Sequence, residues 1–204
     1  SWQVAPLIEQ YGRGEELDYE KEESKKFENM VEEGDTVFDI GAQAGYYTLL
    51  ALHAGAGRVY SFEIIHDYAK EVRRQVGIHN WEKKVEIVEQ ALGQKDGESI
   101  AFKNYLQKGK GRSITIDTYT KKKGIVPNVI KMDVQGNEIV ILRGMKETLE
   151  KHRPRLLVML YEELLQERGE TKEEGLGIIR QAKYKIEQFA NEHSYICLPE
   201  NKTD

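Results

Sequence analysis

The segment VFDIGAQAGYYT, residues Val37 to Thr48, decides the fold, because a short run of β-forming residues passes through a glycine turn into a helical pattern. Gly41 and Gly45 flank the turn, where the backbone can approach a ligand closely, and the following helix points its first N–H groups at that position. Their spacing differs from the Gly-x-Gly-x-x-Gly of dinucleotide-binding enzymes. Asp39 adds a negative charge before the turn, which suits the ammonium and sulfonium of S-adenosylmethionine better than a pyrophosphate.

The second predicted strand, residues 58–62, supports an adenosine ligand because Glu63 follows at its carboxyl end. An acidic residue there, about 20 residues beyond the glycine turn, can accept both ribose hydroxyls. The end of the third strand, around Gln90, should border the adenine ring. An ordinary tight turn and an exposed carboxylate are the alternative interpretations of these signals. The residues predicted to bind the cofactor are Asp39, Gly41, Ala42, Gln43, Gly45, Tyr46, Glu63, Ile64, Gln90, Ala91, Leu92 and Asp133.

Alternation of strands and helices predicts βαβ units and an α/β fold, a mostly parallel sheet with helices on both faces. The last two strands, residues 184–189 and 195–198, are separated by a short polar link that cannot hold a crossover helix, so they should form an antiparallel hairpin. Two further short strands, 100–102 and 113–116, flank a loop rich in glycine and lysine. The predicted main strands are 36–40, 58–62, 85–88, 128–132 and 155–160, and the predicted helices include 66–79, 137–151 and 171–182.

Length and composition indicate a globular protein of one main domain. The chain has 204 residues, 39% of them hydrophobic and 32% charged, and a net charge of -5 that does not favour a broad nucleic-acid surface. We expect an N-terminal helical segment, residues 1–34, packed on the core of a domain spanning 35–204. Cys197 is the single cysteine, which excludes an internal disulfide and suits a cytoplasmic protein. No apolar run is long enough to cross a bilayer, so no membrane partner is expected.

The segment from Val129 to Leu160 resembles the core of FkbM-type methyltransferases. The shared pattern is a strand ending in Lys-x-Asp-x-x-Gly-x-Glu, then a helix with Leu-x-Gly, then a proline before the next strand. The glycine turn and Asp117 also resemble the family, whereas Gln43, Ile64 and the block 135–138 depart from its usual residues. The matching residues of the main block are Lys131, Asp133, Gly136, Glu138, Leu142, Gly144 and Pro154.

This resemblance implies a Rossmann-like seven-stranded sheet and a methyltransferase that uses S-adenosylmethionine and releases S-adenosylhomocysteine. Asp133, at the end of the fourth main strand, is expected to face the methyl group, with Glu138 and Lys131 as further catalytic candidates. Glu138 could instead stabilise a helix N-terminus, and Lys131 could pair with a carboxylate. Asp117 and Glu162 could join these acids around a cation, but no metal is predicted.

Two basic clusters follow the third main strand. Lys108, Lys110 and Arg112 form the first, and the run 121–123 forms the second. They could steer an anionic acceptor towards the site, or they could be ordinary solvated residues of loops or short helices. The loop 105–111 carries two glycines and could be a mobile lid.

The leading hypothesis is a methyltransferase that acts on a hydroxyl oxygen of a small molecule or sugar, which would be its main partner. An RNA methyltransferase is one alternative, because the basic clusters would serve it, and steeply salt-dependent binding would reveal it. A non-catalytic domain that keeps the S-adenosylmethionine fold for binding is another. A dinucleotide-dependent dehydrogenase is disfavoured by the glycine spacing and by the terminal hairpin.

Overall fold

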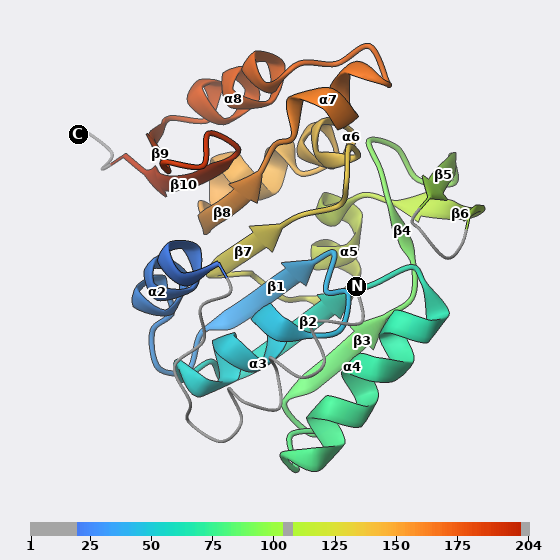
Figure 1. Cartoon of the computed structure of the whole chain (residues 1–204), viewed down its shortest axis with the longest axis vertical. Helices are drawn as coiled ribbons and strands as arrows, with labels where there is room; N and C mark the ends of the chain where they lie inside the picture. The colour runs from blue at the N-terminus through green and yellow to red at the C-terminus, as the bar shows by residue number, and fades with distance from the viewer. Residues whose placement is uncertain (1–19, 104–107, 201–204) are drawn as a thin grey trace. The chain divides into compact units, whose positions relative to one another are not determined.

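A computed structural model describes residues 20–103 and 108–200 of the chain (Figure 1). The chain forms two compact units, the first ending at Glu89 and the second beginning at Gln90. Each unit contributes strands to a Rossmann-like, mostly parallel sheet of seven strands, which confirms the predicted fold class. The predicted division into a helical segment 1–34 and a domain 35–204 stays a prediction.

The first unit contains three parallel strands in the order β3-β2-β1. Thr36 pairs with Arg58, Ile40 pairs with Phe62, and Val59 pairs with Val85. All three strands begin and end at the residues that the sequence predicts. The elements of this unit are α2 (Lys21–Met30), β1 (Thr36–Ile40), α3 (Tyr46–His53), β2 (Arg58–Phe62), α4 (His66–Ile78) and β3 (Val85–Val88).

The core of the first unit forms around α3, whose first seven residues are all buried. Phe38 of β1 lies against the rings of Tyr60 and Phe62, with centroids 5.4 and 5.2 Å away. Helix α2 packs on α3 through an edge-to-face contact between Phe27 and Tyr47 at 5.1 Å. Aromatic pairs of this geometry add to the burial of apolar area, so α2 is held against the glycine turn's helix by its apolar face.

The second unit contains four strands in the order β7-β8-β10-β9. Strands β7 and β8 are parallel, and β10 runs antiparallel to both β8 and β9. The antiparallel hairpin predicted from the short polar link is therefore confirmed. These strands are β7 (Val129–Met132), β8 (Arg155–Met159), β9 (Tyr184–Gln188) and β10 (Ser194–Pro199).

The helix predicted over 137–151 is wrong in one respect, because it breaks at Gly144. A Cβ at Gly144 would lie 2.0 Å from the carbonyl oxygen of Gly93, so the backbone of 93 packs directly on this position. Beyond the break, the Asp117 carboxylate accepts the N–H of Glu147 at 2.9 Å and that of Thr148 at 2.7 Å. The helices of this unit are α5 (Ile116–Lys123), α6 (Glu138–Arg143), the π-helix η1 (Thr148–His152), α7 (Glu162–Gln166) and α8 (Lys172–Gln181).

A separate three-stranded sheet, with the order β4-β6-β5, corrects the prediction for the basic clusters. Its strands are β4 (Ala91–Leu92), β5 (Ser99–Lys103) and β6 (Lys108–Ile114). The first cluster lies in β6 rather than in a loop, so the lid predicted over 105–111 is wrong for 108–111, and 105–107 lie outside the described residues. The second cluster forms the last turn of α5. Ile116 begins that helix instead of ending a strand, because the Thr115 hydroxyl accepts the N–H of Thr118 at 3.0 Å.

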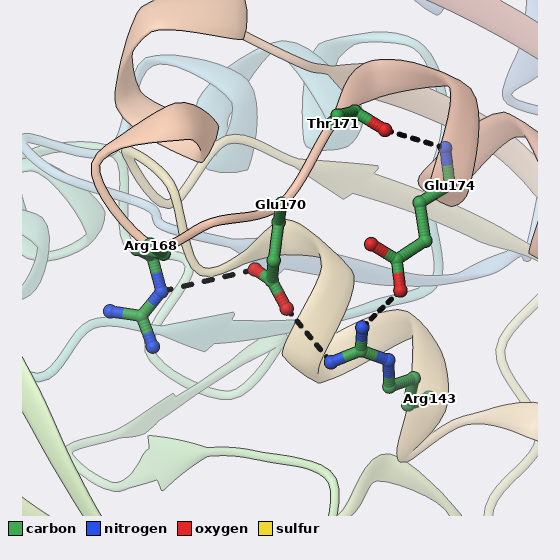
Figure 2. Close-up of polar contacts among 5 residues, drawn as sticks. All are labelled: Arg143, Arg168, Glu170, Thr171 and Glu174. Atoms are coloured by element: carbon green, nitrogen blue, oxygen red, sulfur yellow. Dashed lines mark hydrogen bonds and ion pairs between the residues drawn. The ribbon is translucent and has the colours of Figure 1, made fainter.

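Figure 2 shows a cluster of ion pairs that joins α6 to the start of α8. Arg143, in the last turn of α6, lies 2.8 Å from the Glu170 carboxylate and also binds Glu174. Arg168 approaches Glu170 from the other side at 3.9 Å, and Thr171 caps α8 by accepting the N–H of Glu174. Glu170 is buried, so its charge depends on these cations.

Among the helices of the described residues, none has both the length and the apolar character that a membrane span requires.

Candidate functional site

The glycine turn of the first unit adopts the conformation that its sequence requires. Gly41 and Gly45 have φ angles of 80° and 92°, in the region that favours glycine. The N–H groups of Gly41 and Ala42 both donate to the carbonyl oxygen of Phe62, at 2.9 and 3.1 Å. Gln43 also has a positive φ, 49°, which is uncommon outside glycine. The turn is thus fixed against the end of β2 and carries one strained residue at its centre.

Glu63 holds that strained residue in place. One oxygen of its carboxylate accepts the N–H of Gln43 at 2.8 Å, and the other accepts the N–H of Ile65 at 2.8 Å. Glu63 is only 7% exposed, so these bonds form away from bulk water. The sequence predicts Glu63 as a ribose ligand. It does not predict that Glu63 accepts hydrogen bonds from the backbone of the glycine turn, because no sequence signal shows which N–H groups lie near its carboxylate.

Asp39 is fully buried and fastens three elements of the first unit. Its carboxylate accepts a hydrogen bond from the Thr48 hydroxyl at 2.7 Å, and the same hydroxyl lies 2.7 Å from that of Ser61. These contacts join β1, α3 and β2 directly below the turn. Contact between Asp39 and the cofactor stays a prediction. Because Asp39 is buried, its carboxylate would act on the cofactor from inside the core.

Tyr46 directs its side chain towards α2. Its hydroxyl lies 2.8 Å from that of Ser24, and burial raises the pKa of the Tyr46 phenol. The neighbouring Tyr47 hydroxyl donates to the Glu20 carboxylate at 2.7 Å. Gly45 has no side chain that could cap α3. The backbone N–H groups in the first turn of α3 could therefore donate hydrogen bonds to a ligand.

The ends of β2 and β3 carry a surface ion pair. His66 Nδ1 lies 2.7 Å from the Glu89 carboxylate, and Arg73 binds the same group. The pKa of Glu89 is lowered mainly by the hydrogen bond from His66 and next by the hydrogen bond from Arg73. The next residues belong to the second unit: Gln90 is exposed, and Ala91 and Leu92 form β4. The adenine contact of residues 90–92 and the cofactor contact of Ile64 stay predictions.

In the second unit, the turn after β7 repeats the arrangement seen at Glu63. Gln135 and Gly136 have φ angles of 55° and 97°. The Glu138 carboxylate accepts the N–H of Val134 at 2.8 Å and that of Gly136 at 2.9 Å. Burial, and secondly the charge of Asp133, raise the pKa of Glu138 to about 7, although the backbone donors oppose the shift. Glu138 is therefore the anchor of this turn.

Asp133 has a different environment from Glu138. It is half-buried, and its carboxylate accepts one hydrogen bond from the Gln135 side-chain amide at 2.8 Å. Lys131, two residues earlier along the strand, is buried. Of the three predicted catalytic residues, Asp133 is the one whose charged group reaches the surface of the unit.

The other acids weighed as cation ligands are bound to the protein itself. Asp117 accepts the N–H of Thr148 and also its hydroxyl, both at 2.7 Å. Glu162 accepts the N–H of Lys172 at 3.0 Å and the Gln166 amide at 3.1 Å. Across residues 20–103 and 108–200, no group of three or more histidine, cysteine or acidic side chains could hold a metal ion.

The chain is similar to a known protein family and to several solved structures. Residues 39–196 match the model of the methyltransferase FkbM domain. No curated protein matches the chain. Among solved structures, methyltransferase FkbM from Methylobacillus flagellatus has a TM-score of 0.59 at 15% identity, with 87% of this chain and 51% of that chain covered. The chain thus spans about half the length of that structure.

Two other solved structures share the fold. The SAM-dependent O-methyltransferase from Thermotoga maritima has a TM-score of 0.54 at 12% identity, covering 97% of this chain and 73% of its own. A Streptococcus mutans protein solved in complex with SAH has a TM-score of 0.54 at 13% identity, covering 85% of this chain and 92% of its own. Identities this low carry the fold and leave the acceptor undetermined.

Proposed function

The chain belongs to the FkbM methyltransferase family, and from that premise we propose that it transfers a methyl group from S-adenosylmethionine to a hydroxyl oxygen of a small molecule or sugar. S-adenosylmethionine is the cofactor that the family implies, and S-adenosylhomocysteine is the product. The observation that carries the proposal is the glycine turn, whose strained centre at Gln43 is clamped by the Glu63 carboxylate.

The residues of the first unit fit an adenosine group. A carboxylate can accept about four hydrogen bonds. Each oxygen of the Glu63 carboxylate accepts one backbone N–H, from Gln43 on one oxygen and from Ile65 on the other. The same carboxylate can therefore also accept ribose hydroxyls while it keeps the turn in place. Gly41 leaves the backbone of the turn without a side chain where a ligand would approach, whereas a Cβ at Gly45 would meet Val72 of α4 at 3.4 Å. Bound S-adenosylmethionine supplies a methyl group activated by its sulfonium.

Asp133 is the residue that we assign to the acceptor. Methyl transfer to a hydroxyl forms an O–C bond, breaks the S–C bond and releases the hydroxyl proton, which a nearby base can take. Asp133 is half-buried and is held by Gln135 at 2.8 Å, so its carboxylate is oriented and reachable. Glu138 would position the turn rather than take the proton, because both of its oxygens bind backbone N–H groups. Lys131 would balance the charge of these acids.

RNA is the second candidate acceptor, and exposed cations of the second unit favour it. Lys110 and Arg112 alternate along β6 and so project from the same side of that strand. The exposed lysines 121–123 end helix α5. Binding of RNA would then weaken steeply with salt.

We also propose a cytoplasmic location, because the single cysteine, Cys197, is a fully buried free thiol whose pKa burial raises to about 12.

Isothermal titration with S-adenosylhomocysteine tests the cofactor site. We expect binding to the parent protein and to Glu82→Gln, which removes an exposed carboxylate of the same unit, and much weaker binding to Glu63→Gln. A parent protein that does not bind this ligand would overturn the proposal. The acceptor is then sought with methyl-labelled S-adenosylmethionine against sugars, hydroxylated small molecules and RNA, and Asp133→Asn should abolish transfer.

A further inference from the structure

Strand β9 (Tyr184–Gln188) forms one edge of the strands in the second unit. It pairs with β10 on one side, and no described strand pairs with its other side. Lys185, Glu187 and Gln188 on this strand are exposed to solvent. An open strand edge presents backbone N–H and C=O groups that another strand can pair with.

The hydrogen bonds to β10 show which residues of β9 face outwards. The N–H of Phe189 donates to the carbonyl of Ser194, and the N–H of Glu200 donates to the carbonyl of Lys183, both at 2.9 Å. Residues directly opposite each other in an antiparallel pair exchange hydrogen bonds at every second position. Residues 183, 185, 187 and 189 therefore turn their backbone groups towards β10, and residues 184, 186 and 188 present theirs at the open edge.

We propose that a second copy of this chain pairs with that edge, antiparallel and centred on Ile186. In this register Ile186 exchanges two hydrogen bonds with the partner's Ile186, and Tyr184 lies opposite the partner's Gln188. Lys185 then lies opposite the partner's Glu187, in a position that is not hydrogen-bonded and where side chains are closest. Opposite charges at such positions stabilise a strand pair.

The charges select this register among those that the backbone permits. Pairing centred on Lys185 or on Glu187 would also join outward-facing backbone groups. Such pairing would set lysine against lysine, or glutamate against glutamate, and like charges directly opposite each other are destabilising. A charged edge usually opposes association with foreign strands, so the alternating signs at 185 and 187 favour an identical partner over other strands.

A groove of about 480 Å³ lies beside this edge and gives the partner a surface that is partly apolar and partly polar. Leu176 of α8 and Ile186 of β9 line it, together with polar and charged residues that include Arg180, Tyr195 and Glu200. The partner's Ile186 would arrive on the same face of the extended sheet as this groove. A pair of five-residue strands buries less than the roughly 1,600 Å² of a standard interface, so we expect a weak dimer that forms as the protein concentration rises.

Sedimentation equilibrium of the whole chain, over a wide concentration series, tests the proposal. The parent protein should associate, whereas Lys185→Glu and Glu187→Lys should each stay monomeric because like charges then face each other. The double variant Lys185→Glu/Glu187→Lys should associate as the parent does. An equimolar mixture of the two single variants should also associate, because each chain then meets the opposite charge. Lys83→Glu, an exposed charge reversal in the first unit, is the matched control and should leave association unchanged.

A cross-linking variant tests the register independently. Residues of a hydrogen-bonded antiparallel pair have Cα atoms about 5.5 Å apart, which a disulfide can span. Ile186→Cys should therefore form a covalent dimer on mild oxidation, while the buried Cys197 stays reduced. A parent protein that is monomeric at every concentration would overturn the proposal. A dimer that survives both single charge reversals, or a double variant that fails to associate, would also overturn it.

Discussion

Replacing Glu63 with glutamine tests the idea that one carboxylate holds the glycine turn. The change keeps the side chain's shape, but its new NH₂ group must face a backbone N–H, either that of Gln43 or that of Ile65, which both lie 2.8 Å from the carboxylate. One hydrogen bond to a charged acceptor is lost, and the other becomes neutral. Bonds to charged groups contribute about 1.5–3 kcal/mol and neutral ones about 0.5–1.5 kcal/mol. We therefore expect Glu63→Gln to lower the free energy of unfolding by about 2–4 kcal/mol.

The assay is urea denaturation at neutral pH, supported by thermal unfolding with and without S-adenosylhomocysteine. For a chain of this size the loss corresponds to a fall in Tm of roughly 5–15 °C. The ligand should raise the Tm of the parent protein through binding to the folded state, and it should raise that of Glu63→Gln much less. Glu82→Gln, an exposed change in the same unit, should match the parent in both measurements. If Glu63→Gln unfolds within about 0.5 kcal/mol of the parent, the carboxylate does not clamp the turn.

Substitutions in the second unit have equally definite outcomes. Burial raises the pKa of Glu138 from 4.5 to about 7, so the folded state keeps a proton that the unfolded chain loses. Stability should then fall as pH rises from 4.5 to about 7 and level off above it, and Glu138→Gln should remove that slope in urea titrations. Gly144→Ala should cost more than about 3 kcal/mol in the same assay, because its methyl would lie 2.0 Å from a carbonyl oxygen. Gly177→Ala, which has open space on α8, should be neutral or gain up to about 1 kcal/mol. Arg143→Ala should cost about 1–3 kcal/mol in thermal unfolding, since it leaves the buried Glu170 with one distant cation; no measurable loss would contradict the role of the ion-pair cluster.

The sequence predicts the elements whose formation depends on local pattern. The strands 36–40, 58–62 and 85–88 are correct to the residue, because short β-forming runs end there at polar or glycine-containing turns. The terminal hairpin is correct because the length of its link leaves no other connection. The break at Gly144 could not be predicted, because its cause, the backbone of Gly93, lies far away in the sequence.

The short helix α7 was not predicted, and only the end of β6, residues 113–114, falls within the strand predicted over 113–116. Helix α7 has five residues, fewer than two turns, so its sequence has no clear helical period. Strand β6 is rich in glycine and lysine, which favour loops, yet it pairs with β5 along its length, from Arg112 opposite Ser99 to Lys108 opposite Lys103. Packing of an aromatic side chain on this strand explains why one of its residues is glycine. The Phe102 side chain would meet a Cβ at Gly109 at 2.6 Å, so this position needs glycine in order to pack.

Asp117, Asp133 and Glu138 separate into two roles, and this separation narrows the choice of proton acceptor. Asp117 and Glu138 each use both carboxylate oxygens on backbone N–H groups, and these bonds hold the start of a helical segment or a strained turn. A carboxylate bound in this way cannot approach an acceptor without undoing the local structure. Asp133 instead receives one side-chain donor, from Gln135, and it is half-buried. A half-buried carboxylate with its orientation fixed at one oxygen can take a proton at the other, and this supports our proposal that Asp133 is the base of the reaction.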